Sequence, residues 1–361
     1  MRPVETQVKT LRVRVKDRHA KQLRRMAASV NFVWNYANAL SFRSIKEHGK
    51  FLSYYDIEKY TGGASKELGL HSQTVQNVVK EYTTRREKHK KARLSWRKTR
   101  GVKRSLGWIP INTSASKWKN GKVYHNGDYF GVWDSYGLHQ YKFLTSSFSE
   151  DATGRWYFNV AVEVPVQKST SRKAVGIDLG CKEAVACSDG KKVKGRWYRK
   201  NEEELATAQR AGKKVRVRAI HRKIKNTRND QLQHLSSKIV KKHAAIFVGN
   251  VSSTKLVKTK MAKSVLDAGW GMFKTMLDYK CARAGVVFEE VNEYLTTQIC
   301  SDCDAVSGPK GIAGLGISEW TCGVCRSHHD RNINAAKNIR ARGLARLAGG
   351  NSGLSWIGAA V

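Results

Sequence analysis

The stretch KAVGIDLG at residues 173–180 predicts a buried strand, because its apolar residues lead directly to Asp178 and then Gly180. A β-hairpin follows in VACSDGKKVKG at residues 185–195, where Asp189-Gly190 has the composition of a tight turn. We therefore expect a new domain to begin at about residue 173.

Helices and strands alternate through the rest of this domain. Residues 202–244 are long, basic and helical in pattern, and the apolar strand after them ends at Gly249. Residues 262–284 are helical again, and the strand VVFEEVNE at 286–293 ends at Glu293. The helix INAAKNIRARGLARLA closes the pattern, which predicts an α/β fold.

Two carboxylates, Asp178 and Glu293, are expected at one edge of this sheet. Oxygen-rich clusters of this kind hold Mg²⁺, and two such ions about 4 Å apart would align and activate a water against a phosphodiester. An aspartate after an apolar strand also serves as a cap or a turn in many α/β proteins, so the residue alone leaves both interpretations open.

The N-terminal part has a different pattern. Residues 5–15 and 155–164 alternate polar and apolar side chains, which predicts two strands of one small barrel or sheet. Residues 17 to about 100 lack proline and predict a helical insertion, whose last helix runs into a basic stretch at 85–104. That stretch contains eleven Lys or Arg and one Glu, so we expect it to bind phosphates rather than form a solvated helix face.

Four cysteines form a Cys-x2-Cys, x18, Cys-x2-Cys array, namely Cys300, Cys303, Cys322 and Cys325. Tetrahedral zinc takes four sulfur ligands at about 2.3 Å, and two tight Cys-x2-Cys turns supply that geometry. Four unrelated buried cysteines are the alternative. His328 and His329 adjoin the array, and we expect them to contact phosphate or solvent because four cysteines complete the tetrahedron.

Composition indicates a polyanionic partner. The chain has 361 residues, 40% of them hydrophobic, and a formal net charge of +38, far more than solubility requires. Aromatic residues lie among the cations, and Trp34, Tyr36, Trp96 and Trp108 would stack on bases or pack in the core. Membrane spans and a signal peptide are not expected, and the scattered remaining cysteines fit a reducing cytoplasm.

Five motifs in this order resemble the TnpB family of transposon-encoded, RNA-guided DNA endonucleases, which are related to the type V CRISPR effectors. They are VGIDLG at 175–180, DAGWGMFKTMLDYK at 267–280, EYLTTQICSDC at 293–303, WTCGVC at 320–325 and HDRNINAAKNI at 329–339.

The resemblance implies an α/β fold with a β-barrel and a helical lobe. Its expected parts are a wedge-like β-barrel (1–16 and 105–168), a helical recognition lobe (17–104), a RuvC-like, RNase H-type nuclease domain (173–298 and 327–345), a zinc knuckle inserted in it (299–326) and a flexible tail (346–361). It also implies a prokaryotic, nucleoid-associated protein with a guide RNA, a double-stranded DNA target, structural zinc and catalytic Mg²⁺.

The catalytic residues carry over with two departures. Asp178 matches the first catalytic aspartate, but Gly249 and Asn250 stand where many relatives have the second acid, a glutamate. One branch of the family, including its Fanzor relatives, supplies that glutamate just before the zinc knuckle, and Glu293 in VNEYLTTQ matches this relocated acid. A surface glutamate beside a zinc loop is the alternative.

The third acid is the second departure. The family pattern Arg-Asp-x-Asn-Ala-Ala reads here as Arg-Asn-Ile-Asn-Ala-Ala, with Asn332 in the place of the aspartate. An amide lacks the charge that two dications require, so metal affinity and cleavage should fall. Asp330 could substitute, although a shift of two residues rotates a helical side chain by about 200°, and a helix N-cap is the favoured alternative.

Two functions therefore compete. The first is an RNA-guided, Mg²⁺-dependent DNA endonuclease that reads a short motif beside the target, and the second is a nuclease-deficient guided binder that acts as a repressor. A plain basic RNA-binding protein with a zinc knuckle is a third, less favoured possibility. The expected nucleic-acid contacts are Arg85, Arg86, Lys90, Lys91, Arg93, Arg97, Lys98, Arg100, Lys103 and Arg104.

Overall fold

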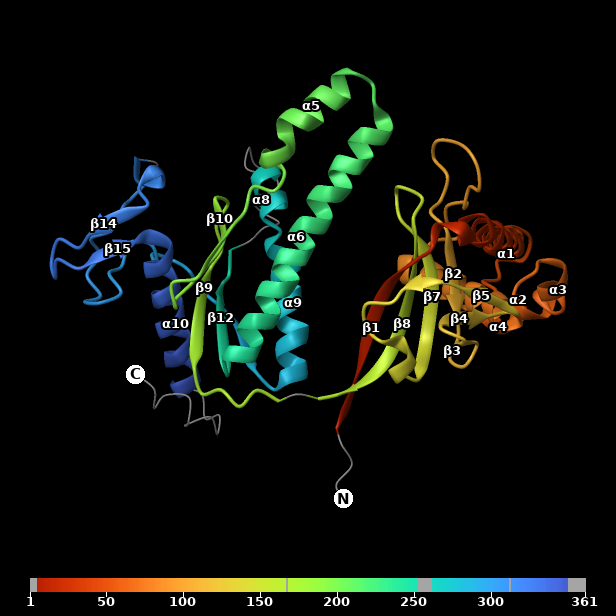
Figure 1. Cartoon of the computed structure of the whole chain (residues 1–361), viewed down its shortest axis with the longest axis horizontal. Helices are drawn as coiled ribbons and strands as arrows, with labels where there is room; N and C mark the ends of the chain where they lie inside the picture. The colour runs from red at the N-terminus through yellow and green to blue at the C-terminus, as the bar shows by residue number, and fades with distance from the viewer. Residues whose placement is uncertain (1–4, 167, 252–261, 312, 350–361) are drawn as a thin grey trace. The chain divides into compact units, whose positions relative to one another are not determined.

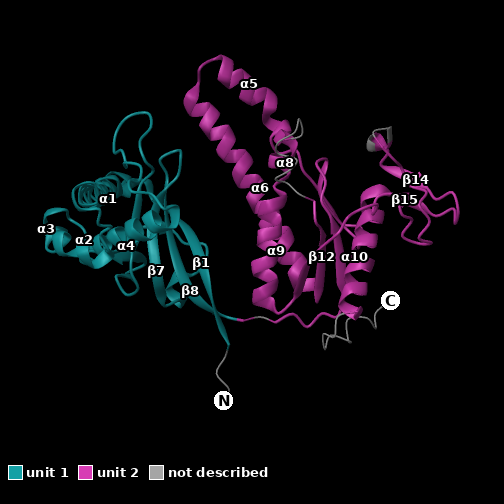
Figure 2. Cartoon of the chain, turned by 180° about the vertical axis from the view of Figure 1, so that it is seen from behind, with its two compact units in different colours: residues 1–165 teal, residues 166–361 magenta. Residues whose placement is uncertain are grey.

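The computed structural model describes residues 5–166, 168–251, 262–311 and 313–349. The chain divides into two compact units, residues 1–165 and 166–361, shown separately coloured in Figure 2. The predicted tail begins inside a helix, since α10 extends to Gly349, and its remainder, 350–361, lies outside the described residues. Among the described helices, none is both long and apolar enough to cross a membrane.

Unit 1 contains a five-stranded antiparallel sheet. Both predicted strands are confirmed, as β1 (Thr6–Val15) and β8 (Trp156–Pro165), and they pair along almost their whole length. The strand order is β2-β7-β8-β1-β6, with β2 at Trp108–Ile111, β6 at Val132–Trp133 and β7 at Phe143–Glu150. A second sheet joins β3 (Ser116–Lys119), β4 (Lys122–His125) and β5 (Asp128–Phe130).

The predicted helical insertion is present between β1 and β2. Its helices are α1 (Ala20–His48), α2 (Tyr54–Thr61), α3 (Ala64–Glu67) and α4 (Ser72–His89). The apolar stripe of α1, from Leu23 to Ala37, is buried in one core with β1 and β8, as its three- and four-residue spacing predicts.

The basic stretch at 85–104 is not a continuous helix, which corrects the prediction. Helix α4 ends at His89, and Lys90 has a left-handed φ of 49°. Residues 91–107 then form an irregular loop whose backbone is hydrogen-bonded to α1 instead of to its own next turn. A local pattern of cations gave no sign of these distant partners.

Unit 2 is built on a mixed five-stranded sheet of order β11-β10-β9-β12-β13 (Figure 1). The strands are β9 (Ala174–Asp178), β10 (Glu183–Cys187), β11 (Lys192–Lys194), β12 (Ala245–Gly249) and β13 (Val287–Val291). The predicted hairpin is β10–β11, and β9, β12 and β13 run parallel. Strand β13 ends two residues before Glu293, so that residue lies in the following turn.

Helices cover both faces of this sheet. Alternate residues of β9 and β12 pack against α6 (Lys214–Lys242) and α9 (Trp270–Ala284) on one face, and Phe247 packs against α10 (Arg331–Gly349) on the other. The predicted helical stretches each divide in two at a glycine region, giving also α5 (Glu202–Arg210) and α8 (Ala262–Ala268). Short 3-10 turns occupy Asp17–His19, Leu138–Gln140, Arg199–Asn201 and Ala313–Gly316.

Helix α10 approaches the sheet closely because each side of the contact has a glycine, Gly176 on β9 and Gly343 on α10 itself. A Cβ added at Gly176 of β9 would lie 2.0 Å from the Ala336 carbonyl oxygen, and one at Gly343 would lie 2.2 Å from the ring of Phe247. The first contact is with backbone, which cannot move without shifting the helix.

We expect Gly176→Ala to lower the free energy of unfolding by roughly 3 kcal/mol, because α10 must move away from β9 to admit the methyl group. Urea unfolding of the full chain measures the loss. Gly271→Ala is the matched control, since a Cβ there meets nothing within 4 Å, and it should change stability by less than about 1 kcal/mol. Equal stability of the two variants would contradict the close contact.

Candidate active site and metal centre

The ends of β9 and β12 lie side by side. In their parallel register Val248 pairs with Ile177, which brings Gly249 beside Asp178 at the next position. Asp178 shares the α10 face of the sheet with Gly176, two residues earlier. The carboxyl ends of two adjacent parallel strands therefore meet under the start of α10.

Glu293 fills the space above Gly249. A Cβ added at Gly249 would lie 2.6 Å from Oε2 of Glu293 and 3.5 Å from its Cβ. The carboxylate thus occupies the volume into which a side chain at position 249 would extend. It reaches the end of β12, beside Asp178, from a turn that follows the neighbouring strand.

Three side chains hold the backbone around Glu293. Its N–H lies 3.4 Å from Oδ1 of Asn250, and its carbonyl accepts a hydrogen bond from the hydroxyl of Thr296 at 2.8 Å. Arg342 of α10 donates at 2.8 Å to each of the carbonyls of Asn292 and Tyr294 on either side. The position of Glu293 is therefore set by β12 and α10 as well as by its own strand.

The proximity of Glu293 is visible in the pKa of Asp178. Burial, together with the charge of Glu293, raises the pKa of Asp178 to about 7, while Arg331 opposes the rise. Burial also raises the pKa of Glu293, against the opposing effect of Lys274. Two carboxylates that are costly to ionise together would be stabilised by a shared cation.

Asp330 caps α10. Its Oδ1 accepts hydrogen bonds of 3.0 Å from the N–H groups of both Asn332 and Ile333, which is the arrangement of an N-cap. Its other oxygen pairs with the ammonium of Lys192 on β11. These contacts hold the pKa of Asp330 below its usual value although burial opposes them.

The amide of Asn332 is engaged by a carboxylate of the β10–β11 hairpin. Its Nδ2 donates to Oε2 of Glu183 at 2.9 Å, and Lys192 lies 3.1 Å from the same oxygen. Asn332, Glu183, Lys192 and Asp330 thus form one hydrogen-bonded cluster at the N-terminus of α10. One ammonium pairs with both of its acids and leaves the cluster with one net negative charge.

Two buried asparagines of α10 fix the segment that leads to the cysteines. Asn334 and Asn338 each donate to the carbonyls of Thr296 and Ile299, at 2.7–3.2 Å. Asn334 also accepts from the N–H of Ser301 at 2.9 Å. The segment from Glu293 to the first cysteine is therefore clamped to the same helix that begins at Asp330.

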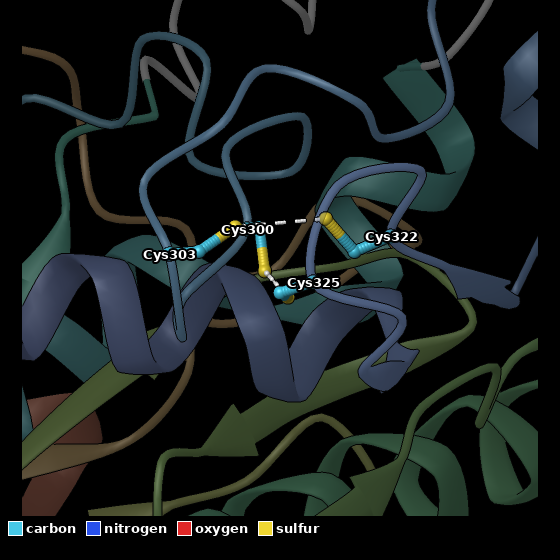
Figure 3. A group of neighbouring side chains, drawn as sticks. All are labelled: Cys300, Cys303, Cys322 and Cys325. Carbon is cyan, nitrogen blue, oxygen red and sulfur yellow. Dashed lines mark hydrogen bonds between the residues drawn. The ribbon is translucent and has the colours of Figure 1, made fainter.

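The four cysteines converge, as Figure 3 shows. Their sulfur atoms all lie within 4.8 Å of one another, with Cys300 and Cys325 at 3.6 Å and Cys303 and Cys322 at 3.7 Å. A tetrahedral ion with sulfur at 2.3 Å requires sulfur separations of about 3.8 Å, so the group could hold a metal such as zinc. A hydrogen bond from Ser307 and backbone N–H groups lower the pKa of Cys322 to about 5, which favours the thiolate that a metal binds.

The second cysteine pair lies in a hairpin of β14 (Glu319–Thr321) and β15 (His328–Asp330). His329 is buried against Trp320, and its Nε2 lies 3.0 Å from the sulfur of Cys300. The expectation of phosphate contact or exposure is therefore wrong for His329, because the alternation of the hairpin turns it inward. His328, on the other face, is exposed.

The ten cations of the predicted nucleic-acid surface fall into two groups, those whose side chains are held within unit 1 and those that are exposed. Arg86 is buried and donates to Ser41 and to the Leu52 carbonyl, so it belongs to the core of unit 1 and is removed from the surface. Arg97 and Arg104 have guanidinium groups engaged by Asn31 and Glu150. The exposed remainder is Arg85, Lys90, Lys91, Arg93, Lys98, Arg100 and Lys103.

Sequence reasoning missed Glu183, Lys192 and Arg342. Glu183 and Lys192 lie on the hairpin after Asp178, where Glu183 pairs in register with Lys194 and Lys192 with Ala186, and their side chains meet at 3.1 Å beside the start of α10. Alternation in the hairpin could have placed them on one face, but nothing local indicated Asn332 as the partner. Arg342 lies three residues after the motif at 329–339. Only the path of α10 brings its guanidinium to the carbonyls on either side of Glu293.

Comparisons with known proteins agree on one group of relatives. Residues 157–260 match the family described as "Probable transposase" (OrfB_IS605), and residues 270–339 match "Cas12f1-like, TNB domain". A "Putative RNA-guided DNA endonuclease" of Streptomyces pristinaespiralis is 33% identical over 225 residues, 57% of this chain and 54% of the relative. The chain thus spans about half the length of that relative.

Two further similarities are more limited. A "TnpB-like protein L79" of Acanthamoeba polyphaga mimivirus is 31% identical over 136 residues, 36% of this chain and 25% of the relative. A solved structure, "Cryo-EM structure of the Cas12f1-sgRNA-target DNA complex", covers 92% of this chain and 99% of its own, with a TM-score of 0.39 and 14% identity.

We expect Asp178→Asn to stabilise the metal-free protein at pH 8. The folded-state pKa of about 7 lies above the ordinary value of 3.8, so the folded protein binds this proton more tightly and loses stability as pH rises from about 4 to 7. The difference in melting temperature between variant and parent, measured in chelator, should grow over that range and vanish below it. Asp230→Asn, at an exposed position on α6, should show no such pH dependence.

The cysteine cluster should retain about one metal ion per chain. Cys303→Ser removes one of four thiolates, so we expect loss of most of the metal and a lower melting temperature, measured by metal mass spectrometry and calorimetry. Cys181→Ser is the control, since Cys181 lies outside the cluster. Full metal content in Cys303→Ser would exclude the four-sulfur site.

Proposed function

This chain belongs to the TnpB family, and we propose that it is an RNA-guided, Mg²⁺-dependent DNA endonuclease. It would bind a guide RNA and a complementary DNA target beside a short motif read by the protein. The observation that carries the proposal is that the carboxylate of Glu293 lies over Gly249, beside Asp178. A net charge of +38 supports nucleic-acid partners.

The nuclease domain is proposed to be RuvC-like, of the RNase H type, and to include residues 173–298 and 327–345. An antiparallel hairpin beside a first strand, followed by two strands parallel to the first, supports this assignment. The cysteine segment at 299–326 would be a zinc knuckle inserted between Glu293 and α10. The N-terminal strands (1–16 and 105–168) would form a wedge, and residues 17–104 a recognition lobe.

Asp178 and Glu293 fit a cation, since two partly buried carboxylates with raised pKa values face one another at a sheet edge. Bound there, Mg²⁺ would polarise a phosphodiester and lower the pKa of a water. Glu293 would take the part of the relocated acid, held by Asn250 and Arg342. The zinc of the four cysteines would be structural, keeping the turn after Glu293 in register with α10.

The second candidate function is a nuclease-deficient guided DNA-binding protein that acts as a repressor. The cluster at the start of α10 favours it, because the Asn332 amide donates to Glu183 and Asp330 is occupied as a cap and by Lys192. The donors on this side do not fit a second dication: one ligand is neutral, and an ammonium already pairs with the carboxylates. Binding of RNA and DNA would remain, since the basic surface lies elsewhere.

A cleavage experiment with Asn332→Asp separates the two functions. The purified ribonucleoprotein is incubated with matched target and Mg²⁺, and binding and cleavage are scored separately. If the parent is nuclease-deficient, binding should equal that of Asn332→Asp while the variant cuts at least about 100-fold faster, since a restored carboxylate recruits the metal. Cutting by the parent at the variant's rate would instead support the nuclease.

Glu293→Gln tests the relocated acid in whichever protein cuts. It removes the charge while keeping the shape over Gly249, so cleavage should fall at least about 100-fold with target affinity unchanged. Glu203→Gln, at an exposed glutamate of α5, is the matched control. Undiminished cleavage by Glu293→Gln would exclude Glu293 as a metal ligand.

A further inference from the structure

The loop of residues 91–107 in unit 1 is strongly basic and strongly held. It contains seven Lys or Arg, and the sequence has no Asp or Glu from residue 88 to residue 127. A free loop of this charge would be extended by its own repulsion. This loop instead has a defined path between α4 and β2, drawn in orange at the top of unit 1 in Figure 1.

Three asparagines of α1 hold the first half of the loop. Asn38 donates to the Leu94 carbonyl at 2.8 Å and accepts from its N–H at 3.1 Å. Asn35 makes the same pair of bonds with Arg97, both at 2.9 Å, and Asn31 accepts from the Arg97 guanidinium at 2.6 Å. Their spacing of four and three residues forms one stripe along the helix. The stripe supplies the hydrogen bonds that a partner strand would supply.

A buried carboxylate holds the second half. Glu150 has a fully buried side chain and accepts two bonds from Arg104, at 2.6 and 2.9 Å, and one from the Gly107 N–H at 3.0 Å. Arg97 reaches across to the carbonyl of Leu106 at 2.9 Å. Both sides of residues 98–105 are therefore anchored to the body of unit 1.

Residues 98–105 form a narrow protrusion, which we call the finger. The Ser105 N–H donates to the Lys98 carbonyl at 2.8 Å, and the chain reverses at Gly101, whose φ is +86°. Val102 at its tip is 94% exposed. Among the described residues, Lys98, Arg100 and Lys103 make no ion pair, so three exposed cations surround an apolar tip.

We propose that the finger inserts into a groove of B-form DNA in the target duplex, with Arg100 and Lys103 on the phosphates that line it. The major groove of B-DNA, about 12 Å wide, admits a two-stranded ribbon, and a methyl-bearing tip can contact thymine. The major groove of A-form RNA is too deep and narrow for such an element. Asn31, Asn35, Asn38 and Glu150 are positioning residues that fix the finger before DNA arrives.

The inference rests on the proposed function only in that DNA is a partner, and it does not require cleavage. It is tested with the purified full chain and two probes, a 30-base-pair DNA duplex and an RNA duplex of the same sequence. The variant is Arg100→Ala with Lys103→Ala, two exposed positions whose loss leaves the anchors intact. Lys59→Ala with Lys66→Ala, exposed on α2 and α3, matches its change in charge.

The finger variant should lose at least about tenfold in affinity for the DNA duplex. For this variant, the slope of log affinity against log salt concentration should become shallower by about 1.8, because each lost phosphate contact contributes about 0.9 to the slope. Affinity for the RNA duplex should change less than about twofold. The Lys59 and Lys66 control should keep the parent's affinity for both probes.

The inference would be overturned if the finger variant lost equal affinity for DNA and RNA, or if the control lost as much affinity as the finger variant. Either result would mean that binding depends only on the net charge of the protein. Asn35→Ala adds a test of positioning with no change of charge: exchange of the Arg97 amide should accelerate and DNA affinity should fall about threefold. Finger-dependent DNA binding by a chain that shows no guide-directed binding or cleavage would refute the proposed function alone.

Discussion

The packing of α10 directly on β9 holds the candidate site together. Gly176 permits the helix backbone to approach the strand, and the same helix then positions three separate parts of the site. Its first turn contains Asp330 and Asn332, its middle clamps the segment before the cysteines, and Arg342 holds the turn around Glu293. A change in the height of α10 over the sheet would displace all three together.

Gly249 also shapes the site, because it has no side chain. Gly249 leaves an open volume at the end of β12, and the carboxylate of Glu293 occupies it from the adjacent strand's turn. The position of the negative charge relative to Asp178 is thereby kept although the residue that supplies it comes from a different part of the chain. The raised pKa of Asp178 is the electrostatic consequence of that proximity and of burial.

The two sides of the site differ in charge balance. On one side, Asp178 and Glu293 repel one another and would gain from a cation. On the other, Lys192 pairs with both Glu183 and Asp330 and offsets one of their two charges, and Asn332 contributes an amide donor. The four cysteines lie between these sides in the sequence, and Asn334 and Asn338 connect them through α10. Metal at the cysteines would therefore stabilise the geometry without entering the chemistry.

Local patterns were enough to predict β1 and β8 of unit 1, the sheet strands of unit 2, the helical insertion, the metal-type cysteine array and the candidate acids Asp178 and Glu293, since alternation, helical spacing and ligand spacing are properties of neighbouring residues. The tertiary structure alone decided which distant groups fill each other's space or complete each other's hydrogen bonds. It placed Glu293 over Gly249, turned Asn332 toward Glu183, buried Arg86 and His329, and bound the loop after His89 to three asparagines of α1. The hydrogen bonds among these contacts join residues from 29 to 149 positions apart, and no periodicity in a sequence specifies a partner at that range.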